Sequence, residues 1–431
     1  MYAIIGAGPT GLAMARNLDR RNIPFVGFEI HSDVGGLWDI DSPTSTMYES
    51  AHLISSKRMT EFKEFPMPEH VADYPSHREM GQYFRDYATH FGLRRHFRFG
   101  TSVDKVERVD GGWELTSTKD GKTQTERFDG ILVANGTLHD PNQITLPGEF
   151  SGEVMHSSSY KNAQQVAGKR VLIIGCGNSG ADIAVEAVHH AASVDISLRR
   201  GYWFMPKYVA GRPIDTLGGK TKLPRRLKQI VDGTLIRSLV GKPSDYGLPD
   251  PDYRLYESHP VMNTLILHHL GQGDIRARKG LRAIEGNTVT FEDGRQGEYD
   301  LILLATGYKL SFPFLDRSHL NWPSDAGAPQ LYLNIFHPEY DDLFLLGMVE
   351  ATGLGWEGRY LQAEVVAAYI EAKRAQSAAY DAARARAREL ATARLDGGYS
   401  YLKLERMAYY VHKDTYLASL QGELAALAVQ R

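Results

Sequence analysis

The sequence predicts an α/β protein built from two Rossmann-like modules, with the second module inserted into the first. Two G-x-G-x-x-G fingerprints each follow an apolar strand pattern and open a helix pattern. Two further apolar strands, "FDGILVANGT" and "YDLILLATGY", follow the fingerprints at nearly equal distances. After the second of these strands the chain resumes a strand and a helix pattern, which indicates a return to the first module.

The first fingerprint lies in "YAIIGAGPTGLAMARNL", as Gly6, Gly8 and Gly11. Glycines without side chains let the backbone approach a pyrophosphate, and the N-terminus of the following helix offers free N–H groups. The next predicted strand, "PFVGFEI", ends in Glu29, at about the usual 20-residue distance. A carboxylate there would bind ribose hydroxyls and repel a 2′-phosphate. This site therefore predicts a dinucleotide with a free ribose.

The second fingerprint lies in "KRVLIIGCGNSGADIAVEAV", as Gly175, Gly177 and Gly180. Its second strand, "SVDISLRR", ends in Arg199 and Arg200, at the place where the first copy has a carboxylate. An arginine pair can bind a 2′-phosphate through charge-assisted hydrogen bonds. The second site is therefore predicted to prefer NADP(H). The alternative is that the two arginines are a solvated strand end.

The closing strands support a duplication of one architecture. Gly136 lies 130 positions after Gly6, and Gly307 lies 132 positions after Gly175. Both strands are nearly continuous apolar runs, as expected of parallel strands that are buried on both faces. Two nested dinucleotide-binding modules explain this spacing better than two unrelated domains do.

The chain order predicts an insertion. We expect the first module to comprise residues 1–165 and 307–431, and the second, NADP(H)-binding module to comprise residues 166–306. Residues 212–260 are rich in Pro, Lys, Arg and Tyr, and we interpret them as a helical excursion near the substrate entrance.

The predicted return to the first module has a strand at Leu343 to Leu346 and a helix from about Glu357. The following segment, "SAAYDAARARARELATARL", is rich in Ala and Arg. It is predicted to be an exposed helix with a role in packing or oligomer contact.

The length and composition limit the number of domains, the kinds of partner and the location that we expect. The length of 431 residues suits two domains, and the net charge of -3 gives no sign of a nucleic-acid or anionic-membrane partner. No run of about 18 apolar residues predicts a membrane span. The single cysteine, Cys176, excludes an intramolecular disulfide, and the chain enters a strand pattern at Tyr2 without a leader pattern. We therefore expect a cytoplasmic protein, with no metal site.

The stretch "FSGEVMHSSSYK" between the two fingerprints fits the pattern FxGxxxHxxx(Y/F)K, as Phe150, Gly152, His156, Tyr160 and Lys161. With this pattern the chain closely resembles the flavin-containing monooxygenases, the class B flavoprotein oxygenases. The related Baeyer-Villiger oxygenases have Trp-Pro or Trp-Asp where this chain has Tyr160-Lys161. "GGLW", "EFPMP", "GCGNSG", "LATGY" and Gln362 in "YLQAE" also match, over roughly residues 1–375.

The resemblance implies FAD and NADPH as cofactors, and oxygenation of soft nucleophiles by a C4a-(hydro)peroxyflavin. The partners would be a small-molecule substrate and O2, and dimers are common in this family. The stretch "FSGEVMHSSSYK" would orient the nicotinamide and relay movement between the modules, or His156 would only bond to backbone at a hinge. The residues predicted to bind FAD are Gly6, Gly8, Pro9, Thr10, Gly11, Glu29, Gly36, Leu37, Trp38 and Gln362. Those predicted to bind NADP(H) are Tyr160, Lys161, Gly175, Gly177, Asn178, Ser179, Gly180, Arg199 and Arg200.

One departure concerns the oxygen site. The family carries an asparagine over the flavin in a pattern like SNxxKEM, and "MYESAHLISSKRM" places Ile54 at that position. Isoleucine cannot donate a hydrogen bond. The residues that could replace the asparagine are His52, Ser55 and Ser56. In an extended segment His52 shares a face with Ile54 and is the first candidate, with a purely structural histidine as the alternative.

Four other functions compete with N- or S-oxygenation. Baeyer-Villiger oxidation of a ketone or aldehyde would use the same cofactors. A poorly coupled NADPH oxidase is suggested by Ile54. A flavin disulfide reductase shares the double-module architecture but needs a dithiol, and this chain has one cysteine. A nucleotide-sensing module would bind FAD and NADP(H) without turnover.

Overall fold

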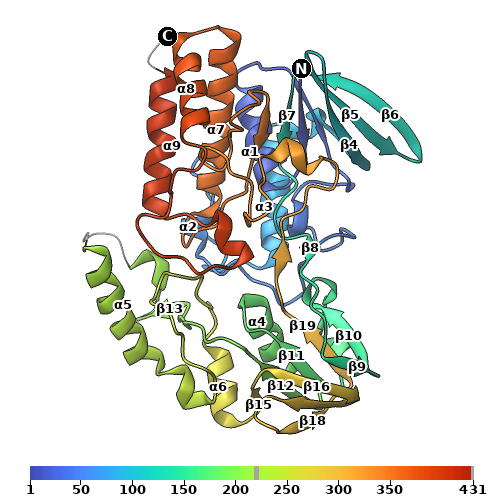
Figure 1. The fold of residues 1–431 in the computed structure, drawn as a ribbon, viewed down its shortest axis with the longest axis vertical. Helices are drawn as coiled ribbons and strands as arrows, with labels where there is room; N and C mark the ends of the chain where they lie inside the picture. The colour runs from blue at the N-terminus through green and yellow to red at the C-terminus, as the bar shows by residue number, and fades with distance from the viewer. Residues whose placement is uncertain (218–222, 429–431) are drawn as a thin grey trace.

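A computed structural model describes residues 1–217 and 223–428. The chain forms two bodies (Figure 1), of which the upper one contains both the N-terminal and the C-terminal segments. The predicted helical excursion at 212–260 includes residues 218–222, which lie outside the described residues.

The upper body is built on a five-stranded parallel sheet with the order β21-β7-β1-β2-β3. Its strands are β1 (Tyr2–Ile5), β2 (Phe25–Phe28), β3 (Phe97–Arg98), β7 (Gly130–Val133) and β21 (Leu343–Leu345). The last strand comes from the segment that follows the second module, so the chain does return to its first sheet. The predicted return strand is thereby confirmed.

The lower body repeats this sheet with the order β10-β19-β11-β12-β15, again all parallel. Its strands are β10 (Glu153–His156), β11 (Arg170–Ile174), β12 (Ser193–Ser197), β15 (Ile275–Arg278) and β19 (Leu301–Leu304). In both sheets the closing strand pairs with the first strand, and the second and third strands follow on the other side. The predicted fold class, two Rossmann-like modules with one inserted into the other, is confirmed.

Each module also carries an antiparallel sheet between its third strand and its closing strand. The upper one comprises β4 (Thr101–Val109), β5 (Gly112–Lys119) and β6 (Lys122–Phe128). The lower one comprises β16 (Leu281–Gly286), β17 (Thr288–Phe291) and β18 (Gln296–Glu298), with β9 (Gly148–Phe150) added at its edge. The duplication therefore extends beyond the parallel sheets.

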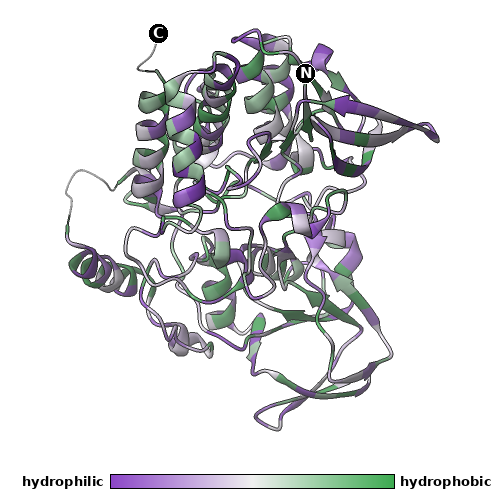
Figure 2. Cartoon of the chain, turned by 45° about the horizontal axis from the view of Figure 1, so that its top comes forward, coloured by the Kyte–Doolittle hydropathy of each residue, from purple (hydrophilic) through white to green (hydrophobic). Residues whose placement is uncertain are grey.

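The closing strands β7 and β19 are buried at every position, as their apolar sequences predict. Figure 2 shows hydrophobic residues concentrated on the strands inside both bodies.

Helices cover both sheets. The upper body has α1 (Pro9–Asp19), α2 (Lys57–Thr60), α3 (His77–His90), α7 (Gly355–Arg374), α8 (Ala378–Glu389) and α9 (Lys413–Ala428). The lower body has α4 (Asn178–Ala187), α5 (Arg225–Val240) and α6 (Leu265–Gln272). Among the described residues, the excursion at 212–260 is only partly helical, because besides α5 and two short 3-10 helices, Ile214–Thr216 and Pro243–Tyr246, it consists of a short strand, turns and irregular segments. Its small hairpin joins β13 (Tyr208–Val209) to β14 (Arg212–Pro213).

The C-terminal segment differs from the expectation of an exposed tail. Helix α8 buries Ala379, Ala383, Arg384 and Ala387, and α9 packs on α7 with Tyr416 fully buried. Alanine at spacings of four leaves one smooth face, on which a neighbouring helix can approach closely. The segment is therefore part of the core of the upper body.

Two connections cross between the modules. Strands β8 (Asp140–Pro141) and β20 (Tyr308–Lys309) pair antiparallel at the crossing. The predicted boundary at residue 165 falls after β9 and β10, which already pair with β16 and β19 of the lower body. We therefore propose that the inserted module begins near β9 rather than at residue 166.

Candidate functional site

The first glycine loop joins β1 to α1 at the carboxyl edge of the upper sheet. Gly6 has φ +105°, a conformation that favours glycine. A Cβ on Gly11 would lie 1.9 Å from the Gly6 carbonyl oxygen, so the helix and the strand approach too closely for any side chain. Helix α1 begins at Pro9 with Gly8 as its N-cap. Its first N–H groups remain available to a phosphate.

Glu29 follows β2 and lies beside this loop. It is 4% exposed, and its carboxylate accepts the Ala7 N–H at 2.5 Å and the His31 N–H at 2.9 Å. Burial raises the pKa of Glu29, and the two N–H donors oppose this shift. The carboxylate is thus held at the place where the dinucleotide fold binds a ribose.

The "GGLW" segment packs against the same loop. A Cβ on Gly36 would lie 3.1 Å from the Gly8 Cα, so the two backbones are in close contact. The Leu37 carbonyl accepts the Ser45 hydroxyl at 2.5 Å. Trp38 stacks edge-to-face on Trp356 of α7 with ring centroids 5.7 Å apart. The segment therefore forms a rigid wall beside the predicted FAD site.

Gln362 lies on α7 and is fully buried. Its Oε1 accepts the Gly347 N–H at 3.0 Å, and its Nε2 donates to the Tyr416 hydroxyl at 2.5 Å. A Cβ on Gly347 would lie 2.8 Å from Thr10 Oγ1. Gln362 therefore fixes the turn next to the first glycine loop. A direct contact of Gln362 with FAD stays a prediction.

The second glycine loop joins β11 to α4 with the same geometry. A Cβ on Gly180 would lie 2.4 Å from the Gly175 carbonyl oxygen, whereas no atom lies within 4 Å of the Cβ position on Gly177. Asn178 Oδ1 accepts the Met262 N–H at 2.8 Å, and Ser179 is half-buried in the first turn of α4. The open space over Gly177 and the free helix N-terminus fit a dinucleotide pyrophosphate.

Arg199 and Arg200 follow the end of β12. Arg199 is exposed and Arg200 is half-buried. Among the described residues neither guanidinium has a hydrogen bond or a salt bridge. Both are free to bind a 2′-phosphate, and that role stays a prediction.

We expect replacement of both Arg199 and Arg200 by Ala to raise the KM for NADPH at least tenfold and to leave the KM for NADH nearly unchanged. One charge-assisted hydrogen bond contributes about 1.5–3 kcal/mol, which sets this lower limit. Steady-state kinetics with both cofactors test the prediction. Equal effects on the two cofactors would mean that the phosphate binds elsewhere.

The "FSGEVMHSSSYK" stretch forms β9, β10 and the crossing between the modules. A Cβ on Gly152 would lie 2.6 Å from the Asp300 carbonyl oxygen, so this position needs glycine. His156 Nδ1 accepts the Ser158 N–H at 3.1 Å, which leaves Nε2 to donate to the Gly307 carbonyl at 3.1 Å. Burial lowers the pKa of His156. The contact with the Gly307 carbonyl fits the alternative in which His156 only bonds to backbone at a hinge.

Tyr160 and Lys161 bind protein groups. Tyr160 is fully buried, and its hydroxyl donates to Glu186 on α4 at 2.8 Å. The Lys161 ammonium donates to the Ser45 carbonyl and, at 3.2 Å, to the Met47 carbonyl. These contacts join the upper body to α4. Direct contact of Tyr160 and Lys161 with NADP(H) stays a prediction.

The segment around Ile54 bends rather than continuing as an extended chain. The bend falls at Ile54 and Ser55, so the extended conformation assumed for this segment does not continue past Ile54. His52 is exposed with Nδ1 2.9 Å from the Ser50 carbonyl, whereas Ile54 packs against an apolar cluster. The buried members of that cluster are Trp203, Met205, Ile236, Tyr253, Leu255 and Met262.

The two serines of this segment have different partners. Ser55 Oγ lies 2.7 Å from Thr60 Oγ1. Ser56 is buried, and its N–H donates to Asp215 Oδ2 at 2.7 Å. Ser56 Oγ and Asp215 Oδ1 are buried atoms that lack a hydrogen-bond partner among the described residues. They are the polar atoms of this segment that a ligand could satisfy.

A cluster of titratable residues at the module interface was missed by the sequence analysis. Asp182 on α4 accepts Asn263 Nδ2 at 2.6 Å and the Tyr48 hydroxyl at 3.3 Å. Burial raises the pKa of Asp182 and lowers that of the nearby Lys207. The only available signal was the position of Asp182 two residues after the "GCGNSG" motif. Perturbed groups of this kind concentrate at functional sites.

Two features are absent from residues 1–217 and 223–428, the part of the chain that the structure describes. In these ranges no helix has both the length and the apolar character needed to cross a membrane. No group of three His, Cys, Asp or Glu side chains in the same ranges could hold a metal ion.

The family model that matches this chain and two of its sequence relatives are all named as monooxygenases. The family model described as "Flavin-binding monooxygenase-like" matches residues 1–379. The flavin-containing monooxygenase 5 of Oryctolagus cuniculus is 33% identical over 376 residues, which cover 81% of this chain and 69% of the relative. A relative from Pan troglodytes, named dimethylaniline monooxygenase (N-oxide-forming) 2, is 31% identical over 387 residues, covering 84% and 72%.

The solved structures show the same fold at lower identity. An open crystal structure of cyclohexanone monooxygenase has a TM-score of 0.73 and 19% identity, and the match covers 99% of this chain and 96% of that one. At this identity the likeness shows the fold alone.

Proposed function

Because this chain belongs to the flavin-binding monooxygenase-like family, we propose that it oxygenates soft nucleophiles, namely the nitrogen of amines or the sulfur of sulfides. As a family member it is a flavoprotein monooxygenase with FAD and NADPH as cofactors. The name of the N-oxide-forming relative supports the choice of amines. The observation that carries the proposal is the pair of phosphate-binding glycine loops, each at the carboxyl edge of its own parallel sheet.

The chain's own contribution is placement and the exclusion of water. Bound FAD would supply the redox chemistry, namely uptake of hydride from NADPH and transfer of one oxygen atom of O2 to the substrate, with the other oxygen atom released as water. The first loop and Glu29 would hold the adenosine and pyrophosphate of FAD. The second loop with Arg199 and Arg200 would hold those of NADPH. The reaction requires no nucleophile from the protein. The chain would therefore contribute to catalysis by positioning the cofactors and the substrate.

The surroundings of Ile54 support a substrate that reacts in its uncharged form, as a neutral amine or a sulfide does. Ile54 packs against a cluster of Trp, Tyr, Met, Leu and Ile side chains that comes from the lower body. Apolar walls with few polar groups favour small apolar ligands, and desolvation strengthens the reactivity of an amine or sulfide lone pair. A charged substrate would lose hydration in such surroundings without recovering it.

The test is a comparison of three substrates. Purified FAD-loaded enzyme is given a tertiary amine, a dialkyl sulfide and a cyclic ketone, and NADPH consumption, hydrogen peroxide and product are measured for each. We expect N-oxide or sulfoxide as the main product. A lactone from the ketone as the main product would replace the proposal by Baeyer-Villiger oxidation.

A second candidate function is a poorly coupled NADPH oxidase, because Ile54 cannot donate the hydrogen bond that the family's asparagine provides. We expect the wild type to release measurable hydrogen peroxide, and Ile54→Asn to lower the ratio of peroxide to NADPH consumed. One hydrogen bond in a dry site contributes about 1–3 kcal/mol, or about 5- to 150-fold in a rate. Peroxide and NADPH assays on the same sample measure the ratio.

His52→Ala is the companion variant. A higher peroxide ratio in His52→Ala would assign the protective role to His52, as the sequence predicts. An unchanged ratio would leave His52 as a structural histidine. If the wild type releases no peroxide and Ile54→Asn changes nothing, the oxidase candidate fails and backbone groups must replace the asparagine.

A further inference from the structure

Lys207 carries a charge without an ionic partner at the boundary between the two bodies. It is half-buried, and among the described residues its ammonium forms no hydrogen bond and no salt bridge. Nζ lies over the Tyr74 ring of the upper body, 5.1 Å from the ring centroid. Nζ is not fully enclosed by protein atoms. A half-buried cation of this kind has lost part of its hydration, and a ligand can supply the missing partner.

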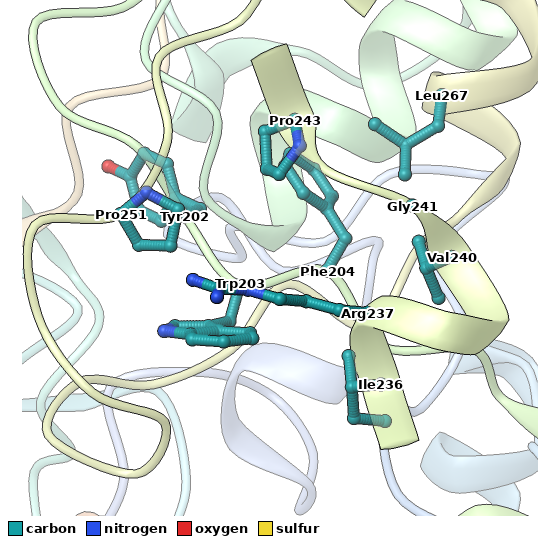
Figure 3. Close-up of a pocket in the computed structure, with 10 residues that line it drawn as sticks. All are labelled: Tyr202, Trp203, Phe204, Ile236, Arg237, Val240, Gly241, Pro243, Pro251 and Leu267. Carbon is teal, nitrogen blue, oxygen red and sulfur yellow. The ribbon is translucent and has the colours of Figure 1, made fainter. Parts of the chain in front are cut away.

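The backbone that leads to Lys207 is held in the lower body. The Val261 N–H donates to the Trp203 carbonyl, and the Met205 N–H donates to the Val261 carbonyl, both at 2.8 Å. Figure 3 shows the Trp203 ring beside a small pocket next to α5. The Lys207 carbonyl itself accepts the hydroxyl of Tyr74. The backbone and the ammonium of Lys207 therefore both contact Tyr74, which fixes the side chain toward the upper body.

Tyr74 lies beside the segment that contains Ile54. The backbone carbonyls on either side of Tyr74 accept the Lys57 N–H at 2.7 Å and the Leu53 N–H at 2.9 Å. The family resemblance aligns Ile54 with the asparagine that lies over the flavin. The ammonium of Lys207 is thus directed at the part of the upper body that is expected to face the flavin.

The charges near Lys207 limit the kind of ligand that it can bind. Asp182 on α4 attracts the Lys207 ammonium, but the two groups form no salt bridge. Asp182 also accepts the Tyr48 hydroxyl of the upper body at 3.3 Å. A second carboxylate, Asp215, lies near Tyr74. Two carboxylates around one ammonium disfavour an anionic ligand and suit a neutral group that accepts a hydrogen bond from Lys207.

We propose that the Lys207 ammonium binds the nicotinamide half of NADP(H), with the carboxamide oxygen as the acceptor. Arg199 and Arg200 would hold the 2′-phosphate within the lower body, at the end of β12. Hydride transfer requires the other end of the cofactor to reach the flavin, and therefore to lie between the bodies. Lys207 belongs to the lower body and contacts a ring of the upper body, so it lies on that path. A carboxamide is neutral, and it offers the acceptor that the ammonium lacks.

Binding of NADP+ and of 2′,5′-ADP to the FAD-loaded enzyme tests this, because 2′,5′-ADP has the 2′-phosphate but no nicotinamide. Lys207→Met removes the ammonium and keeps an unbranched side chain. We expect it to raise the Kd for NADP+ roughly tenfold or more and to leave the Kd for 2′,5′-ADP unchanged. Lys207→Arg keeps the charge and should lose much less affinity for NADP+. Isothermal titration calorimetry measures both ligands without turnover or substrate, so the result is independent of the class of substrate.

Two controls frame the experiment. Lys122→Met makes the same chemical change at an exposed position on β6 and should leave both affinities unchanged. Replacement of both Arg199 and Arg200 by Ala should weaken both ligands, because both carry the 2′-phosphate. An unchanged Kd for NADP+ in Lys207→Met would overturn the proposal and leave Lys207 as a structural cation on Tyr74. Equal weakening of the two ligands would also overturn it, because the ammonium would then act on the lower body as a whole.

Discussion

Gly11→Ala is expected to yield a protein that loses FAD during purification. The new Cβ would lie 1.9 Å from the Gly6 carbonyl oxygen, so α1 must move away from β1. That movement displaces the free N–H groups of the helix N-terminus from the pyrophosphate position. Overpacking of a tight contact costs about 1–3 kcal/mol, so we expect the Kd for FAD to rise about 5- to 150-fold. Flavin absorbance and titration of apoprotein with FAD measure the change.

Two further glycines make this experiment specific. Gly180→Ala places a Cβ 2.4 Å from the Gly175 carbonyl oxygen in the second loop, so it should retain FAD and lose rapid reduction by NADPH. Gly422→Ala in α9 meets no atom within 4 Å and should leave both cofactors bound. Normal FAD affinity in Gly11→Ala would show that the first loop adapts to a side chain. Loss of FAD from Gly180→Ala as well would indicate general unfolding.

The fold was predictable because its signals are local. Each glycine loop, its flanking strand and its helix lie within a short stretch, and the closing strands are apolar enough to identify without knowledge of their partners. The position of Glu29 also follows from a local rule, since it stands at the end of the second strand. Arg199 and Arg200 stand at the same place in the second module.

The parts that were not predictable depend on contacts between distant segments. Nothing near Lys161 in the sequence indicates that its ammonium binds the Ser45 and Met47 carbonyls. The bend at Ile54 and Ser55 likewise accompanies packing of Ile54 against the lower body. A rule based on the alternation of side chains along a strand does not include such contacts.

The amino-acid composition of a segment also does not show which of its side chains are buried. Helix α8 was expected to be exposed because it is rich in arginine, yet Arg384 is buried and donates to the His337 carbonyl at 2.7 Å.

The second large effect is expected from Asp195→Ala in the lower sheet. Asp195 is fully buried in the middle of β12. Its carboxylate accepts Arg276 Nε at 2.7 Å, Arg278 Nε at 2.6 Å and the Tyr299 hydroxyl at 2.6 Å. Removal of the carboxylate leaves Arg278, which is 14% exposed, without a counter-charge. Breaking a buried ion pair from one side costs about 3–5 kcal/mol, so we expect a loss of that size in the free energy of unfolding.

Urea denaturation measures this loss, and Asp293→Ala is the matched control. Asp293 pairs with the exposed Arg295 at 3.7 Å, and an exposed pair of this kind contributes about 0–1 kcal/mol. Because β12 leads directly to Arg199, Asp195→Ala should also weaken NADPH binding while FAD stays bound to the upper body. If Asp195→Ala lowers the free energy of unfolding no more than Asp293→Ala does, the hydrogen bonds of Asp195 only offset the desolvation of its carboxylate. The network would then define the alignment of β12 and β15 without stabilising the module.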